Sequence, residues 1–283
     1  MKTKLILVEG IPGSGKSTIA KKIQEYLKSQ DINAVLFNEG DAHPTDLAWC
    51  SYIPVNEFTE IINKYPQYSQ VINNNTVIEN DFAVVAYTKL GITPSENEIM
   101  KYFETHEVYD GRVAFEKFTN LHQKRWRRFA EKAINENNVS IFECAFFQNH
   151  VCELMGFHNK EICYISEYLT SLISTVKELN PLIIYLSQPD VSETIRRVSK
   201  ERVSDDKSKH SDWIDLVINW VEKSQYGKKH ALKGFDGAIQ FLKERKRIEL
   251  EVFEKLAIDK YIIKNLDYNW DDVFNTVKEL LST

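Results

Sequence analysis

The sequence has no long hydrophobic run. None of its apolar stretches approaches the roughly 20 residues that a membrane-spanning helix needs, and the first, at residues 5–8, stops at Glu9, too early for a signal peptide. Its four cysteines sit at spacings that match neither a zinc site nor a CxxC redox motif. Cys144 and Cys163 lie in apolar runs and are expected in the core. These absences predict a soluble, cytoplasmic protein without a zinc site.

A strong charge of one sign is also lacking. The 283 residues carry 36 basic and 41 acidic side chains, so the net charge is −5. This balance argues against a global preference for nucleic acid or for an anionic membrane. Hydrophobic residues make up 43% of the chain and charged residues 27%, which is enough for a sizeable buried core.

Short apolar runs rich in β-branched residues alternate with segments of helical periodicity. The runs predict five strands, at residues 5–8, 34–37, 139–142, 182–186 and 261–263. Apolar positions recur at helical spacing after the first run, and a last helix is expected at about 271–281. The alternation predicts an α/β fold, in which a mainly parallel five-stranded sheet has helices on both faces.

Two long intervals interrupt this alternation. The first, at about 45–135, contains a hairpin predicted at 76–90 that turns near Asn80. This interval ends in a helix predicted at 113–133. The second, at about 190–258, has the pattern of several helices. Because no internal repeat or low-complexity linker separates these parts, we expect a single domain over residues 1–283 with two insertions.

A glycine-rich segment directly follows the first predicted strand. Residues 10–17 fit the pattern G-x-x-x-x-G-K-[ST] in full. Its glycines let backbone N–H groups turn inward as an anion nest, Lys16 would carry positive charge to the β- and γ-phosphates, and the Ser17 hydroxyl would ligate Mg²⁺. The segment predicts a site for ATP or GTP with magnesium. Its residues are Gly10, Pro12, Gly13, Ser14, Gly15, Lys16, Ser17 and Thr18.

Polar side chains also follow two other predicted strands. Glu143 comes after the run at 139–142, where a carboxylate would support Mg²⁺ or would merely end the strand. Glu39, Asp41 and His43 lie within five positions after the run at 34–37. One of the two carboxylates, with the imidazole as the third candidate, would accept the proton of an attacking hydroxyl. The alternative for this segment is turn formation alone.

Basic residues gather on two predicted helices. Arg196, Arg197 and Arg202 come after the fourth predicted strand, where they would close as a lid over transferring phosphates or form a solvated face. Arg125 and Arg128 lie off the apolar stripe of the helix predicted at 113–133. These two would reach an anionic substrate or face solvent.

Together these segments resemble the P-loop kinases of the nucleoside and nucleoside-monophosphate type, including thymidylate kinases and deoxynucleoside kinases. The resemblance rests on residues 8–18, on 182–190 with 195–202, and on 261–281. It implies that the interval at about 45–135 lies on the acceptor side and that the interval at about 190–258 is a helical lid.

The resemblance also implies roles for individual residues. Arg197 and Arg202 become catalytic lid residues, Arg196 joins the donor site, and Glu39 matches the catalytic carboxylate after the second strand. In that family an arginine follows the acidic residue that ends the third strand. Here Cys144 follows Glu143 instead. The arginine is then absent or replaced from elsewhere, with Arg112 and Arg125 as the candidates.

These features predict an enzyme, a kinase that transfers the γ-phosphoryl group of ATP to a small hydroxyl- or phosphate-bearing acceptor such as a nucleoside or nucleotide. One alternative is an antibiotic or other natural product as the acceptor. Another, of a different class, is a nucleotide-dependent switch or regulatory NTPase. The predicted partners are a nucleoside triphosphate and a small molecule, without nucleic acid or membrane, for a monomer or homodimer.

Overall fold

The computed structural model describes residues 2–92, 98–207, 211–265 and 268–282. The chain divides into two compact units, residues 1–37 with 126–283 (unit 1) and residues 38–125 (unit 2). The sequence predicts one domain with an insertion at about 45–135. In the structure the segment 38–125 has its own sheet and its own hydrophobic core, and for this reason it forms a separate unit.

Unit 1 is built on a parallel five-stranded sheet in the order β2-β6-β1-β7-β8. Its strands are β1 (Leu5–Gly10), β2 (Ala34–Phe37), β6 (Val139–Glu143), β7 (Leu182–Ser187) and β8 (Asp259–Lys264). The central strand β1 is buried along its whole length, as a parallel strand covered on both faces must be. All five strands predicted from the sequence are confirmed.

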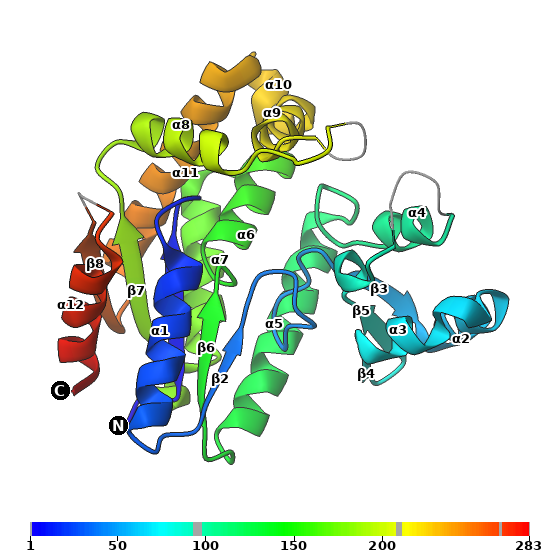
Figure 1. Cartoon of the computed structure of the whole chain (residues 1–283), viewed down its shortest axis with the longest axis horizontal. Coiled ribbons are helices and arrows are strands. Elements are labelled where there is room, and N and C mark those ends of the chain that lie inside the picture. The colour runs from blue at the N-terminus through cyan, green and yellow to red at the C-terminus, as the bar shows by residue number, and fades with distance from the viewer. Residues whose placement is uncertain (1, 93–97, 208–210, 266–267, 283) are drawn as a thin grey trace. The chain divides into compact units, whose positions relative to one another are not determined.

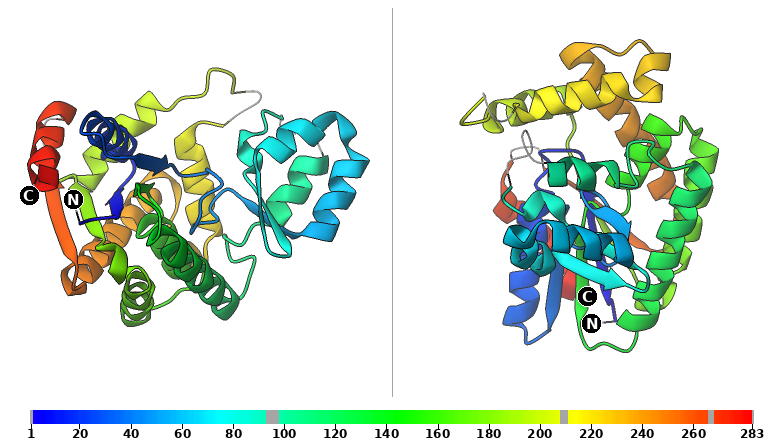
Figure 2. Two further views of the ribbon diagram at one scale, coloured as in Figure 1. Left: turned by 90° about the horizontal axis from the view of Figure 1, so that it is seen from below. Right: turned by 90° about the vertical axis from the view of Figure 1, so that its right-hand side faces the viewer.

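Helices cover both faces of this sheet (Figures 1 and 2). The helices of unit 1 are α1 (Lys16–Ser29), the second half of α5 (Phe115–Ala133), α6 (Gln148–Val151), α7 (Ile162–Ser174), α8 (Val191–Glu201), α9 (Trp213–Lys223), α10 (Gln225–Lys229), α11 (Gly234–Lys255) and α12 (Trp270–Ser282). On one face α1 and α12 enclose an apolar core with Ile6 and Val8 of β1. On the other face, Phe253 of α11 packs edge-on against Tyr185 of β7. The predicted α/β fold is confirmed.

The interval predicted as several helices contains α8, α9, α10 and α11. α11 packs against α7, α8 and α9. One prediction for unit 1 is wrong: Cys144 is buried, but Cys163 is exposed. Cys163 lies in the first turn of α7, whose buried face is formed by other positions, including Ile165 and Leu169.

Unit 2 contains an antiparallel three-stranded sheet in the order β3-β5-β4. The strands are β3 (Ser51–Pro54), β4 (Thr76–Glu79) and β5 (Phe82–Val85). β4 and β5 form the predicted hairpin, which turns at Asn80 with a φ of +54°, a conformation that asparagine tolerates well.

Helices α2 (Val55–Lys64), α3 (Ser69–Asn74) and α4 (Glu98–Thr105) complete the core of unit 2. That core includes Ile53, Ile72 and Phe103. The sequence does not predict β3 or these helices, because each is short and buries its apolar positions only against the others. Within the described parts of the chain, no helix is long and apolar enough to cross a membrane.

Candidate functional site

The segment between β1 and α1 folds into a tight glycine loop. Gly13 has a φ of +79° and Gly15 a φ of +92°, a region that strains any residue with a Cβ. A Cβ on Gly13 would lie 2.0 Å from Val198 of α8, and one on Gly15 would lie 2.1 Å from the Trp270 ring at the start of α12. The loop is therefore packed closely by both elements, and neither position accommodates a side chain.

Three carbonyl oxygens of this loop accept hydrogen bonds from cationic side chains. The pairs are Lys16 Nζ with Ile11 O at 3.0 Å, Arg197 Nη2 with Gly13 O at 2.9 Å, and Arg245 Nη2 with Gly10 O at 3.3 Å. In a trans peptide the carbonyl and the following N–H point in opposite directions. With Gly10 O turned toward Arg245, the N–H of Ile11 in the same peptide points the other way. Ile11 O precedes Pro12, which has no N–H, and the N–H of Ser14 donates to Ile11 O at 3.2 Å.

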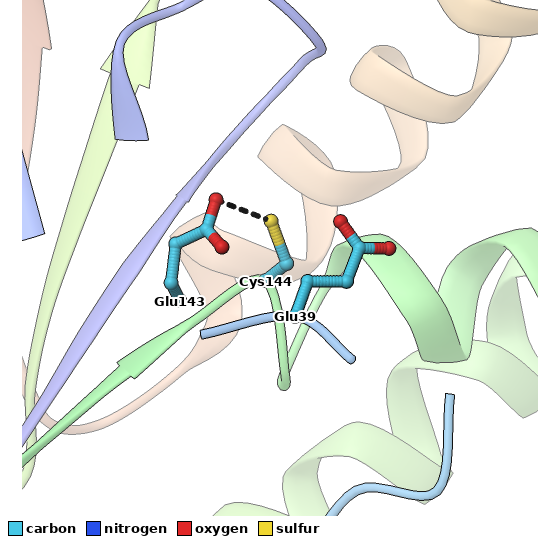
Figure 3. Close-up of side chains that lie close together, drawn as sticks. All are labelled: Glu39, Glu143 and Cys144. Carbon is cyan, nitrogen blue, oxygen red and sulfur yellow. Dashed lines mark hydrogen bonds between the residues drawn. The ribbon is translucent and has the colours of Figure 1, made fainter. Parts of the chain in front are cut away.

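A hydroxyl and a carboxylate meet where the loop joins α1. Ser17 Oγ donates to Glu143 Oε1 at 3.0 Å, and Glu143 lies at the end of β6, next to β1. Figure 3 shows that the Cys144 thiol also donates to this carboxylate, with Sγ 3.1 Å from Oε1. These oxygens suit Mg²⁺, a cation that takes oxygen ligands and keeps several waters, whereas the thiol does not. The residues therefore fit a magnesium ion held by Ser17, with Glu143 beside it.

The three arginines predicted as a lid have different surroundings. Of these three, within the described residues, Arg197 alone hydrogen-bonds to the glycine loop, and its guanidinium carbon lies 3.8 Å from the centre of the Tyr268 ring. Arg196 lies over Phe235 at 5.0 Å and lines a groove along α8. Arg202 lies over the ring of Trp213 at 5.3 Å.

Two aromatic residues near the loop were missed in the sequence. Tyr268 and Trp270 have ring centres 6.2 Å apart, and Trp270 covers Gly15 while Tyr268 lies against Arg197. The signal was their place between the last predicted strand and the last predicted helix, but nothing in the spacing ties them to the loop.

A buried carboxyl group precedes the loop and was missed as well. Glu9 is fully buried, and its carboxyl oxygens accept the backbone N–H groups of Phe146 at 2.7 Å and Gln148 at 3.2 Å. Burial raises the pKa of Glu9 to about 8, although these two N–H groups act in the opposite direction. A glutamate that ends an apolar run gives no sequence signal that it continues inside a strand.

The three candidate bases lie together in unit 2, each with neighbours of its own. Glu39 Oε1 accepts the indole N–H of Trp49 at 3.1 Å. Asp41 accepts the N–H of Asn38 at 2.6 Å and forms an ion pair with Lys89.

His43 is the most enclosed of the three. It is buried, and its Nδ1 accepts the N–H groups of Thr45 and Asp46 at 3.1 Å and 3.0 Å. Burial lowers the pKa of His43 well below its usual range, and the charge of Arg125 lowers it further. The turn at 43–46 is thus organised around a neutral imidazole.

The remaining substrate candidates lie at different places. Arg125 neither faces solvent nor lies at a surface: only 2% of its side chain is exposed, and it pairs with Glu79 and donates to the carbonyl of His43. The turn at 43–46 and strand β4 bury it, which helical periodicity alone does not reveal. Arg112 pairs with acidic neighbours, Glu104 at 3.4 Å among them, and Arg128 is exposed.

One family model matches the N-terminal part of the chain. A family model described as chromatin associated protein KTI12 matches residues 3–68, which include β1, the glycine loop, α1 and β2. A search of curated proteins finds no match.

Among solved structures, the chain is similar to thymidylate kinase from Ehrlichia chaffeensis, with a TM-score of 0.44, 11% identity, and 99% of each chain covered. It is also similar to thymidylate kinase from Candida albicans, with a TM-score of 0.44, 14% identity, and 99% of this chain and 91% of that one covered. Scores of this size add nothing to the fold that the strand order gives. The parallel sheet with the glycine loop between β1 and α1 is a P-loop kinase-like fold.

Proposed function

We propose that the protein is a phosphotransferase that moves the γ-phosphoryl group of ATP or GTP to a small hydroxyl- or phosphate-bearing acceptor. The observation that carries this proposal is the 3.0 Å hydrogen bond between Ser17 and Glu143, with Lys16 in the same loop. A bound Mg²⁺ would supply charge neutralisation on the phosphates. The chain itself contributes the loop N–H groups, the Lys16 ammonium and the oriented Glu143 carboxylate, which together hold the triphosphate.

The donor side would also use residues that pack on the loop. Arg197 reaches Gly13 O and lies on the Tyr268 ring, so its guanidinium is held next to the loop at two points. A cation in that position stabilises charge that develops on a transferring phosphoryl group. Arg202, which packs on Trp213, contributes more weakly in this proposal because no contact ties it to the loop in the described residues.

Glu39 is our choice among the three base candidates. Asp41 uses one carboxylate oxygen for the turn and the other for Lys89, and His43 accepts two backbone N–H groups at the nitrogen that would take a proton. Glu39 has the indole of Trp49 as a donor that orients its carboxylate. A carboxylate so oriented can accept the proton of an attacking hydroxyl.

The test is ADP release from Mg·ATP across nucleosides, nucleoside monophosphates and hydroxyl-bearing antibiotics. We expect one class to stimulate release, and Lys16→Ala and Glu143→Gln to lower the stimulated rate by about 10²-fold or more. The matched controls are Lys21→Ala, exposed on the same helix α1, and Glu167→Gln, exposed on α7. Release that no acceptor stimulates, from a protein that binds Mg·ATP, would refute the kinase and favour a slow regulatory NTPase.

A further inference from the structure

A buried arginine on α11 touches the first glycine of the phosphate-binding loop. Arg245 is 2% exposed, and its Nη2 donates to Gly10 O at 3.3 Å. Its Nε lies 3.0 Å from Glu249 Oε1, one turn further along α11, and Glu249 in turn accepts the hydroxyl of Tyr185 on β7 at 2.6 Å. The guanidinium is thus fixed between its own helix, the sheet and the loop.

The next residue of α11 makes a similar contact with the next connection. Lys246 Nζ donates to the carbonyl of Gln188, which follows β7. Two residues later Asp190 caps α8 by accepting the N–H groups of Ser192 and Glu193. Consecutive basic residues of α11 therefore hold the carbonyl at the start of the glycine loop and the carbonyl before the helix that carries Arg197.

Stability alone does not account for a buried ion pair at this position. Removing a guanidinium and a carboxylate from water costs free energy that their attraction does not reliably recover, and apolar replacements are often neutral or stabilising. What the pair does provide is a charged donor at a fixed place against Gly10 O. Its partner Glu249 lies one turn away on the same helix, so this donor moves only when α11 moves.

We propose that Arg245 is a positioning residue that holds the phosphate-binding loop in its anion-binding conformation and couples it to α11. The inference rests on the proposed function, because it assigns the loop to phosphate binding. With Gly10 O held toward α11, the N–H of Ile11 in the same peptide is aimed away from it. Arg245 and Arg197 then hold two loop carbonyls from two helices, and α11 packs against α8, which bears Arg197.

The experiment measures the Kd of Mg·ATP and of Mg·tripolyphosphate by calorimetry. Tripolyphosphate probes the loop without a nucleobase. We expect Arg245→Met to weaken both ligands by about tenfold or more, as for a lost charge-assisted hydrogen bond, and Arg245→Lys to fall between Met and wild type. The matched control, Arg247→Met, removes an arginine of the same helix that pairs with Glu244 and Glu251 at the surface, and it should bind as wild type.

The outcomes separate the two proposals. If the wild type binds neither ligand, the proposed function fails. If the wild type binds both, and a folded Arg245→Met variant binds them as tightly as Arg247→Met does, Arg245 is only structural and the inference is overturned. Should the Met variant not fold, Arg245→Lys decides, because a folded Lys variant with wild-type Kd for both ligands also overturns it.

Discussion

Among the described residues, each unit contains one buried arginine paired with a glutamate, and the surroundings of the two pairs differ. In unit 1, Arg245 pairs with Glu249 on its own helix and donates to the glycine loop. In unit 2, Arg125 pairs with Glu79 of the hairpin and donates to the turn at 43–46. The same chemistry therefore links a helix to the glycine loop in one unit and to a turn in the other.

The electrostatic surroundings of the two arginines differ as well. Burial lowers the pKa of Arg125, and the opposing charge of Glu79 does not fully compensate. Burial also acts to lower the pKa of Arg245, but Glu249, Cys152 and Tyr185 together raise it above its usual range. Two glutamates extend the comparison, because burial raises the pKa of Glu9 in unit 1 to about 8 and that of Glu107 in unit 2 to about 7.

The largest expected effect on stability is at Arg125. Replacing it by Met leaves Glu79 without its cation and the buried carbonyl of His43 without its donor, so we expect the free energy of unfolding to fall by about 3–5 kcal/mol. Chemical denaturation of both proteins measures this. Arg128→Met, three positions along the same helix and exposed, should change stability by no more than about 0.5 kcal/mol. If Arg125→Met lowered the free energy of unfolding no more than Arg128→Met does, the ion pair of Arg125 with Glu79 would not stabilise unit 2.

Glu9 and Glu107 should differ in their pH windows. Both pKa values lie above the ordinary 4.5, so the folded state retains these protons longer and loses stability as pH rises, by up to about 1.4 kcal/mol per pH unit for each group. The loss runs from about pH 4.5 to about 8 for Glu9 and to about 7 for Glu107. Glu9→Gln should therefore reduce the fall of the free energy of unfolding with pH over the whole range up to about pH 8, and Glu107→Gln only below about pH 7.

Denaturation midpoints at half-unit steps between pH 5 and 8.5 measure these windows. The interval from pH 7 to 8 is decisive, because only Glu9→Gln should reduce the slope there. A Glu9 variant with the wild-type slope in that interval would mean that its carboxyl is already ionised at neutral pH.

The smallest expected effect is at Arg112. Its ion pairs with Glu104 at 3.4 Å, Glu107 at 3.7 Å and Asp110 at 3.9 Å are long, and its own side chain is partly exposed, so Arg112→Met should cost no more than about 1 kcal/mol. Because Arg112 lowers the pKa of Glu107, the variant should also extend the pH window of Glu107 upward. Denaturation midpoints at pH 7 and pH 8 test this. If the midpoint changed between these pH values as much in the variant as in the wild type, Arg112 would have no effect on the pKa of Glu107.

The glycine loop and its sheet could be predicted because their signals are local. Residues 5–8 are apolar and β-branched, residues 10–17 match a phosphate-loop pattern, and helical spacing follows at once. Glu143 could be proposed because the carboxyl ends of parallel strands meet at one edge, and Ser17 indeed lies 3.0 Å away. Unit 2 was predicted only in its hairpin and in its part of α5, because its other elements are short and depend on each other for burial.

The sequence by itself determined the fold class, the glycine loop and the strand that bears Glu143, since each depends on residues close together in the chain. Only the tertiary structure decided which charged side chains are buried and which groups they contact. Arg125 and Arg245 both lie in helices that carry other charged residues nearby, and no periodicity shows that one meets a turn and the other the glycine loop. A buried charge is defined by the partners that fold around it, and the carbonyls that Arg125 and Arg245 contact, those of His43 and Gly10, lie 82 and 235 residues away along the chain.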